Sequence, residues 1–188
     1  QYVLKNSYIF IFNLSYIQIM NYNKSFNFLK NLPLKLNSFY KKKSNSGIKV
    51  NNKSKSKKDF DPVTNFDKAF EKYIRSLINK KFPKDAIIGE EFSDKFSDNN
   101  YKWSVDPIDG TRAFVIGAPT WSNLISLSFE EKSLIGLANF PELSKFYIND
   151  KKKSYLFNSN KKTVLKSSNN NNLKLSLIHI SEPTRPLR

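Results

Sequence analysis

The 188-residue sequence contains no cysteine and a single histidine, His179. The lack of cysteine excludes a disulfide framework, a thiolate zinc site and a cysteine nucleophile. One histidine argues against a histidine-rich metal site or a Ser-His-Asp triad. Carboxylates, hydroxyls, lysines and backbone groups remain for chemistry. The length predicts one ordinary domain or a piece of a larger one, and an apolar fraction of 39% is enough for a core.

Arginine is also scarce, although the chain is strongly basic. The formal net charge of +16 comes from 32 basic residues, of which only four are arginine. Nucleic-acid surfaces usually mix arginine and aromatic side chains with lysine, and the lysine-rich segments 41–43 and 53–58 lack both. We interpret them as solvated loop charge, with A/T-rich codon usage behind the excess of lysine and asparagine. A nucleic-acid-associated protein stays open as an alternative, and its binding would collapse as salt rises.

The two ends of the sequence are predicted to be foreign to the domain. Polar side chains interrupt residues 1–19, which fall short of a membrane span of ~18 apolar residues and lack a small-residue signal cleavage site. We expect translated upstream sequence there, with Met20 as the start, and a cytoplasmic protein without a membrane partner. Residues 175–188 contain LSLIHISEPTR, which resembles a translated sequencing adaptor. We expect read-through here, so His179 receives no catalytic role.

The interior predicts an α+β fold in which helices precede strands. Apolar residues recur at irregular helical spacing over 21–43, where Pro33 is expected to kink or split the helix. A loop is predicted over 44–58. Thr64 to Asp67 matches a capping box that opens a second helix, which ends at Phe82. Strands are then predicted at 86–89, 101–105, 121–129, 134–139, 146–149 and 155–157.

Carboxylates carry the chemistry of this sequence. Eleven of the sixteen acidic residues lie between Asp59 and Asp109. Asp106 and Asp109 sit where a predicted strand meets a turn, and Pro107 fixes the backbone between them so that both carboxylates can converge. Glu90, at the end of a neighbouring predicted strand, adds a third. Oxygen ligands of this kind suit Mg²⁺.

Gly110 and Thr111 extend this motif toward a phosphate. Glycine lets a phosphate approach the backbone closely, and the two N–H groups would then bind it at a helix N-terminus. The Thr111 hydroxyl is available to orient water. The string Asp-Pro-Ile-Asp-Gly-Thr also fits a simple turn, but the upstream Gly89–Glu91 favours a metal site.

Three blocks resemble the inositol monophosphatase family of Mg²⁺-dependent, lithium-sensitive phosphatases. They are residues 61–67 (DPVTNFD), 88–91 (IGEE) and 103–114 (WSVDPIDGTRAF), in the order and approximate spacing of the family. Residues 111–121 are most similar to the histidinol-phosphatase-like branch, with inositol phosphates or nucleotide 3′-phosphates as alternative substrates. The resemblance implies that residues 20–174 form the N-terminal part of a layered α/β/α/β/α sandwich.

The resemblance also implies a role for each matching residue. Glu90, Asp106 and the Ile108 carbonyl would hold one Mg²⁺, and Asp106 and Asp109 a second. Glu90 and Thr111 would position the attacking water, with Asp67 near Thr111. Asp109, Gly110 and Thr111 would face the phosphate of a small metabolite, in a parent protein that is a candidate homodimer.

The chain departs from the family in one respect. The family carries a Trp-Asp motif in its C-terminal half, and the chain ends before it. We therefore expect the fragment to be poorly stable and inactive. A non-catalytic relative that acts as a binding module is the alternative from a different class.

Overall fold

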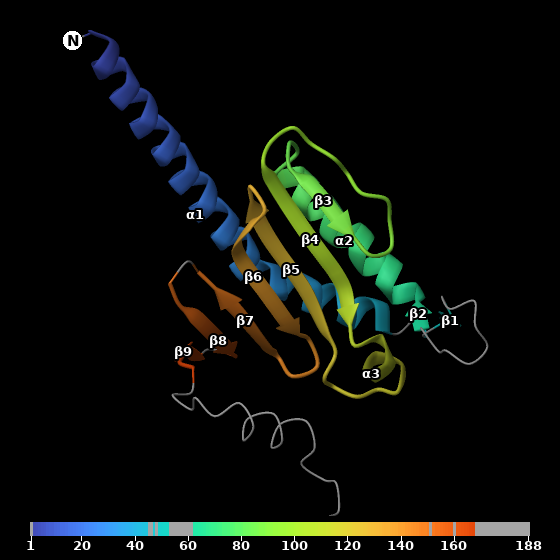
Figure 1. Ribbon diagram of the computed structural model, residues 1–188. Helices are drawn as coiled ribbons and strands as arrows, with labels where there is room; N and C mark the ends of the chain where they lie inside the picture. Colours follow the sequence, from blue (N-terminus) through green and yellow to red (C-terminus); the bar gives the residue numbers. More distant parts are fainter. Residues whose placement is uncertain are drawn as a thin grey trace, which may run out of the picture.

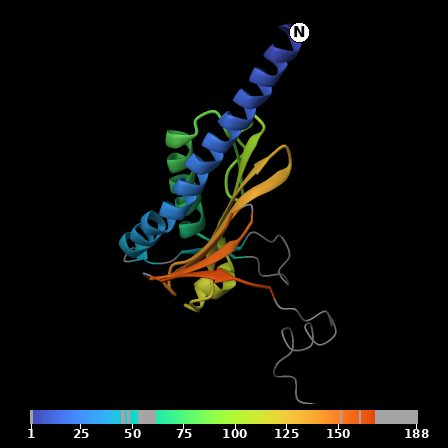
Figure 2. The same cartoon turned by 90° about the vertical axis from the view of Figure 1, so that its left-hand side faces the viewer.

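A computed structural model describes the backbone of residues 2–44, 47, 49–52, 62–150, 152–159 and 161–167, and the side chains in these ranges apart from residues 2–21, 52, 62 and 63. The predicted α+β layout is confirmed: two long helices lie on one side of a curved sheet (Figure 1, Figure 2). The lysine-rich segment 53–58 and the expected read-through at 175–188 lie outside the described residues. Within the described ranges, no helix is long and apolar enough to cross a lipid bilayer.

Helix α1 (Tyr2–Ser44) is continuous through Pro33, so of the two predicted outcomes the split is wrong and the kink stays a prediction. Its second half packs on the sheet, and its first half projects past it (Figure 1). Leu29, Leu32 and Leu36 share one face and are at most 1% exposed. Burial of each leucine contributes about 2 kcal/mol, which together outweighs the roughly 3 kcal/mol that proline costs inside a helix.

Helix α2 (Asn65–Lys81) begins at the predicted capping box. The Thr64 side chain accepts a hydrogen bond from the backbone at the start of the helix, and Asp67 accepts one from the Thr64 N–H. One face of the helix is then fully buried at four-residue spacing, by Phe66, Phe70, Ile74 and Ile78. The amphipathic pattern therefore fixes which side of α2 meets the sheet.

The sheet has seven strands that lie in the order in which the chain forms them. They are β3 (Ala86–Gly89), β4 (Tyr101–Asp109), β5 (Ser122–Phe129), β6 (Lys132–Phe140), β7 (Lys145–Asn149), β8 (Ser154–Asn158) and β9 (Lys161–Leu165). Among the described residues, the β3–β4 pair of this sheet is parallel and each later pair is antiparallel. Helix α3 (Thr111–Val115) follows β4, and Trp103 and Trp121 are buried in the core.

All six predicted strands are present, with differences at their ends. β4 continues to Asp109, past the predicted end of that strand, so the Asp-Pro-Ile-Asp motif belongs to the sheet. Strand β9 was not predicted. Two short strands outside the main sheet, β1 (Val50–Asn52) and β2 (Pro62–Thr64), pair antiparallel, so a strand forms inside the expected loop.

Candidate functional site

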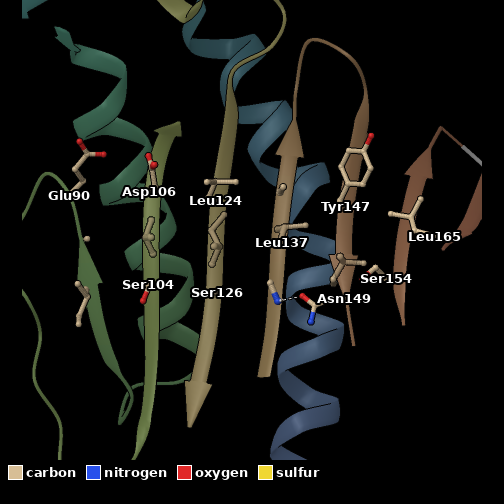
Figure 3. Close-up of a pocket in the computed structure, with 17 residues that line it drawn as sticks. Glu90, Ser104, Asp106, Leu124, Ser126, Leu137, Tyr147, Asn149, Ser154 and Leu165 are labelled. Carbon is tan, nitrogen blue, oxygen red and sulfur yellow. Dashed lines mark hydrogen bonds between the residues drawn. The ribbon is translucent and has the colours of Figure 1, made fainter. Parts of the chain in front are cut away.

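A hollow of about 770 Å³ lies on the face of the sheet that the helices leave uncovered (Figure 3). Side chains from the middle strands form its floor, with Ser104, Leu124 and Ser126 among them. Glu90 and Asp106 lie beside each other at one end of it (Figure 3). Two of the three carboxylates singled out in the sequence, those of Glu90 and Asp106, therefore face an open concave surface.

The parallel pairing of β3 with β4 brings Glu90 and Asp106 together. Gly89 and Val105 form the last pair of this register, so Glu90 and Asp106 are the next residues along each strand. The two carboxyl groups lie close enough for Glu90 to raise the pKa of Asp106.

Asp106 lies in an environment that opposes its negative charge. Burial raises the pKa of Asp106 to about 6, and repulsion from Glu90 and Asp109 adds to this effect. A hydrogen bond from the Ile108 backbone acts in the opposite direction and lowers the pKa. Its Oδ1 atom is buried and has no hydrogen-bond partner in the described part of the chain. Burial and the neighbouring carboxylates thus oppose ionisation of Asp106 in the described part of the chain.

A bulge in β4 places Asp109. Asp106 pairs with Leu124 and Asp109 with Ser122, so two residues of β4 lie opposite Asn123 alone. Ser122 Oγ donates to Asp109 Oδ2 at 3.3 Å, on the exposed rim of the site. The bulge shifts the strand locally, which explains how two aspartates three residues apart both reach one region.

Gly110 and Thr111 turn the chain from β4 into α3. Gly110 has φ of +82°, in the left-handed region that glycine adopts at little cost. The Thr111 hydroxyl donates to the Ile108 carbonyl at 3.1 Å. This contact ties the hydroxyl proposed to orient water to the carbonyl proposed as a metal ligand.

The Asp67 side chain is buried, at 2% exposed, and accepts hydrogen bonds at the start of α2. Its Oδ2 accepts from the Thr64 N–H at 2.7 Å and from the Thr64 hydroxyl at 2.6 Å. The Thr111 hydroxyl is directed to Ile108 instead. The structure therefore gives Asp67 a structural task, and a joint role for Asp67 and Thr111 stays a prediction.

Three polar residues that the sequence analysis did not single out support the site. Glu71 is fully buried and accepts the backbone N–H of Glu90, while Asn123 of β5 and Asn139 of β6 form a buried amide pair. Glu71 left a signal in the sequence, because it is a charged residue on the buried face of an amphipathic helix. Asn123 and Asn139 gave no such signal, because the sequence is rich in asparagine and nothing distinguishes these two from the others.

The oxygen-bearing residues of the site are of the type that binds a hard divalent cation. The unpartnered Asp106 Oδ1 is an acceptor that a cation would satisfy, and Glu90 and the Ile108 carbonyl supply oxygen donors beside it. Across the described ranges, no three Asp, Glu, His or Cys side chains converge closely enough to enclose an ion by themselves. Mg²⁺ tolerates this, because it usually keeps several waters and takes one or two carboxylates from the protein.

These features define an α+β protein with an acidic site at the end of a parallel strand pair. The model of the inositol monophosphatase family matches residues 33–187. The match extends over well more than half of the sequence, and the chain belongs to this family. The resemblance seen in the three sequence blocks is thereby confirmed.

Relatives and a solved structure agree with this assignment. The chain is 45% identical over 92 residues to a histidinol-phosphatase of Chlorobaculum parvum, covering 49% of this chain and 36% of that protein. It is 34% identical over 99 residues to a fructose-1,6-bisphosphatase/inositol-1-monophosphatase of Aquifex aeolicus, covering 53% and 37%. The structure superposes on the Thermotoga maritima IMPase with a TM-score of 0.60 at 26% identity, covering 78% and 53%. The chain thus spans about a third of the length of these curated relatives.

Proposed function

We propose that this chain is part of a Mg²⁺-dependent phosphomonoesterase that hydrolyses a small phosphorylated metabolite. The single observation that carries the proposal is the crowding of Glu90 and Asp109 around Asp106, whose buried Oδ1 has no partner within the described residues. Histidinol phosphate is the first substrate to test, because the chain is similar to a histidinol-phosphatase. An inositol monophosphate is the second.

In this proposal the chain holds the metal through oxygen atoms alone. Glu90, Asp106 and the Ile108 carbonyl would hold one Mg²⁺, and Asp106 and Asp109 would share a second. A bound divalent ion would lower the pKa of a water molecule bound to it and would neutralise negative charge on the phosphate. The buried position of Asp106 strengthens its attraction for a cation, since water screens the charge less there.

The remaining residues position the reactants. Glu90 and Thr111 would orient the water, and the Glu90 carboxylate would accept its proton as the water oxygen bonds to phosphorus. The ester P–O bond breaks, and the leaving alkoxide takes a proton from solvent. Asp109, Gly110 and Thr111 border the position of the phosphate. Asp67 is proposed to keep the start of α2 in place beside them.

Other properties of the longer protein are also proposals. A cytoplasmic location and a homodimer are expected, with neither nucleic acid nor a membrane as partner. The lack of arginine and aromatic side chains within the lysine-rich segments 41–43 and 53–58 supports solvation rather than a binding patch. Co-sedimentation with nucleic acid at low and moderate salt is the direct check.

The experiment is a phosphate-release assay on the protein encoded by the complete native reading frame. We expect Mg²⁺-dependent release from histidinol phosphate or inositol monophosphate, and Asp106→Asn is expected to lower kcat/KM at least about a hundredfold. Asp98→Asn, in an exposed loop, is the matched control and should leave the rate unchanged. Equal rates for Asp106→Asn and the wild type would reject the proposed site. The 188-residue chain itself is expected to be inactive.

A non-catalytic relative that binds phosphorylated metabolites is the second candidate. The observation that favours it is the open carboxylate geometry, in which no three acidic side chains of the described ranges enclose an ion. This candidate predicts saturable binding of the phosphate ester without phosphate release in the complete protein. Release above the buffer rate would exclude it.

A further inference from the structure

Glu71 is a fully buried carboxylate that lies directly behind the proposed metal site. It sits on α2 and is 0% exposed. Its Oε2 accepts the backbone N–H of Glu90 at 2.9 Å and that of Glu91 at 2.6 Å. Both donors follow the last residue of β3, where the ladder to β4 has ended. Glu71 therefore takes over the hydrogen bonding of the backbone at the point where Glu90 begins.

Arg75 completes the environment of this carboxylate. Its Nε donates to Glu71 Oε1 at 2.7 Å, one helical turn away. Its Nη2 donates to the Phe92 carbonyl at 3.2 Å. One buried carboxylate and one arginine thus hold the segment from Glu90 to Phe92 at both ends. A buried charge needs partners of this kind to be tolerated.

Gly89 shows how closely the strand end and Glu71 approach. A Cβ atom built on Gly89 would overlap the Glu71 carboxylate and lie 2.8 Å from Arg75 Nη2. No side chain larger than hydrogen fits between the two. The contact therefore fixes the distance between the Gly89 backbone, which precedes Glu90, and helix α2.

From these contacts we propose that Glu71 is a positioning residue for Glu90. It anchors the Glu90 and Glu91 amides to α2, and so holds the Glu90 carboxylate beside Asp106. The inference rests on the proposed metal site, which it deepens. Groups that orient a ligand from behind typically govern metal affinity by about 10- to 100-fold. Glu71 does not touch the substrate or the ion in this account.

The test is Mn²⁺ binding by the 188-residue chain, measured from the loss of the free-ion electron paramagnetic resonance signal. Glu71→Gln keeps the shape of the side chain but replaces one acceptor oxygen with an NH₂ group, which faces N–H donors. We expect its Mn²⁺ dissociation constant to rise about tenfold. Glu71→Asp keeps the charge but withdraws it from the amides, and we expect a similar loss.

Asp85→Asn is the matched control. Asp85 is also a buried carboxylate with two hydrogen bonds, from Trp103 Nε1 and Asn99 Nδ2, both at 2.8 Å, but it precedes the opposite end of β3. Its replacement should lower the melting temperature without changing the Mn²⁺ dissociation constant. A loss of stability alone is thereby separated from a loss of positioning.

Glu90→Gln separates the two proposals. If Glu90→Gln binds Mn²⁺ as the wild type does, the metal site itself is wrong. If Glu90→Gln loses binding while both Glu71 variants keep wild-type affinity, the metal site stands and the positioning role is overturned. If neither Glu71 variant folds, hydrogen exchange of the Glu90 and Glu91 amides in the metal-free wild type decides. Slow exchange supports the anchor, and exchange at the rate of an open chain overturns it.

Discussion

Asn123 donates a 2.6 Å hydrogen bond from its side-chain amide to the Pro107 carbonyl, within the bulge of β4. The bulge removes this carbonyl from the regular ladder, and the buried asparagine replaces the missing donor. Asn139 in turn donates to Asn123 Oδ1 at 2.9 Å and to Asn37 Oδ1 of α1 at 2.9 Å. The backbone between Asp106 and Asp109 is thus tied through two strands to the first helix.

Replacing Asn123 with alanine should therefore destabilise the chain and disturb the site together. The Pro107 carbonyl would be left buried without a donor, which costs about 1–3 kcal/mol. Urea denaturation measures this loss. Asn31→Ala is the control, because Asn31 is exposed and its amide bonds only to Asn27 of its own helix turn; it should stay within about 0.5 kcal/mol of the wild type. Equal effects of the two substitutions would show that the bulge needs no anchor.

Asp106→Asn is expected to stabilise the metal-free chain near neutral pH. The folded-state pKa of Asp106, about 6, lies above the ordinary aspartate value of 3.8. The folded state thus binds more protons between these values, so stability falls as pH rises through this window. The substitution removes the repulsion between the carboxylates and should raise the free energy of unfolding by about 1 kcal/mol at pH 7.5. The gain is limited because water screens part of that repulsion.

The melting temperatures of the wild type and Asp106→Asn in EDTA, at pH 4.5 and pH 7.5, measure this effect. The two proteins should differ more at pH 7.5 than at pH 4.5. Added Mg²⁺ should raise the melting temperature of the wild type and leave that of the variant unchanged. A constant difference across pH would show that the carboxylates do not interact as the structure indicates.

Gly89→Ala should be among the most destabilising small substitutions in the chain. The added methyl group would lie 2.5 Å from Glu71 Cδ, so the strand end and α2 must separate. Overpacking of this kind typically costs about 1–3 kcal/mol, occasionally more. Gly117→Ala is the control, because its Cβ would meet nothing within 4 Å and only the φ of +73° is unfavourable. The free energy of unfolding should fall more for Gly89→Ala than for Gly117→Ala.

Thr64→Ala should weaken the start of α2. Its hydroxyl accepts the Phe66 N–H at 3.1 Å and donates to Asp67. Loss of such a cap costs about 1–2 kcal/mol. Thr64→Ser keeps the hydroxyl and should retain most of the stability. Thermal denaturation followed by far-ultraviolet circular dichroism compares the two, and equal melting temperatures would contradict the capping role.

Local chemistry made much of this fold predictable. The Thr64 capping box and the four-residue spacing of apolar side chains in α2 act within one segment, so the sequence reveals them directly. The strands that follow are marked by short apolar runs. The approach of Glu90 to Asp106 was also predictable, because the sequence places each of them at the end of one of two neighbouring predicted strands.

The remaining features depend on contacts between distant segments. Pro33 lies inside a continuous helix because the leucines around it are buried by the sheet, which local propensity does not reveal. The bulge in β4 depends on Asn123, and the position of Glu90 on Glu71. Each of these partners lies more than a dozen residues away, and each is an ordinary polar residue until the chain folds.

The parallel pairing of β3 with β4 determines which part of the sheet a bound metal ion would stabilise. All carboxylates of the site lie between residues 90 and 109, at the far end of the sheet from β7, β8 and β9. Cooperative units within a domain can open separately, each with its own free energy. A metal titration would therefore slow amide exchange in β3 and β4 and leave an opening of the antiparallel edge undetected. Metal binding would therefore report on the local stability of β3 and β4, and not on that of the whole sheet.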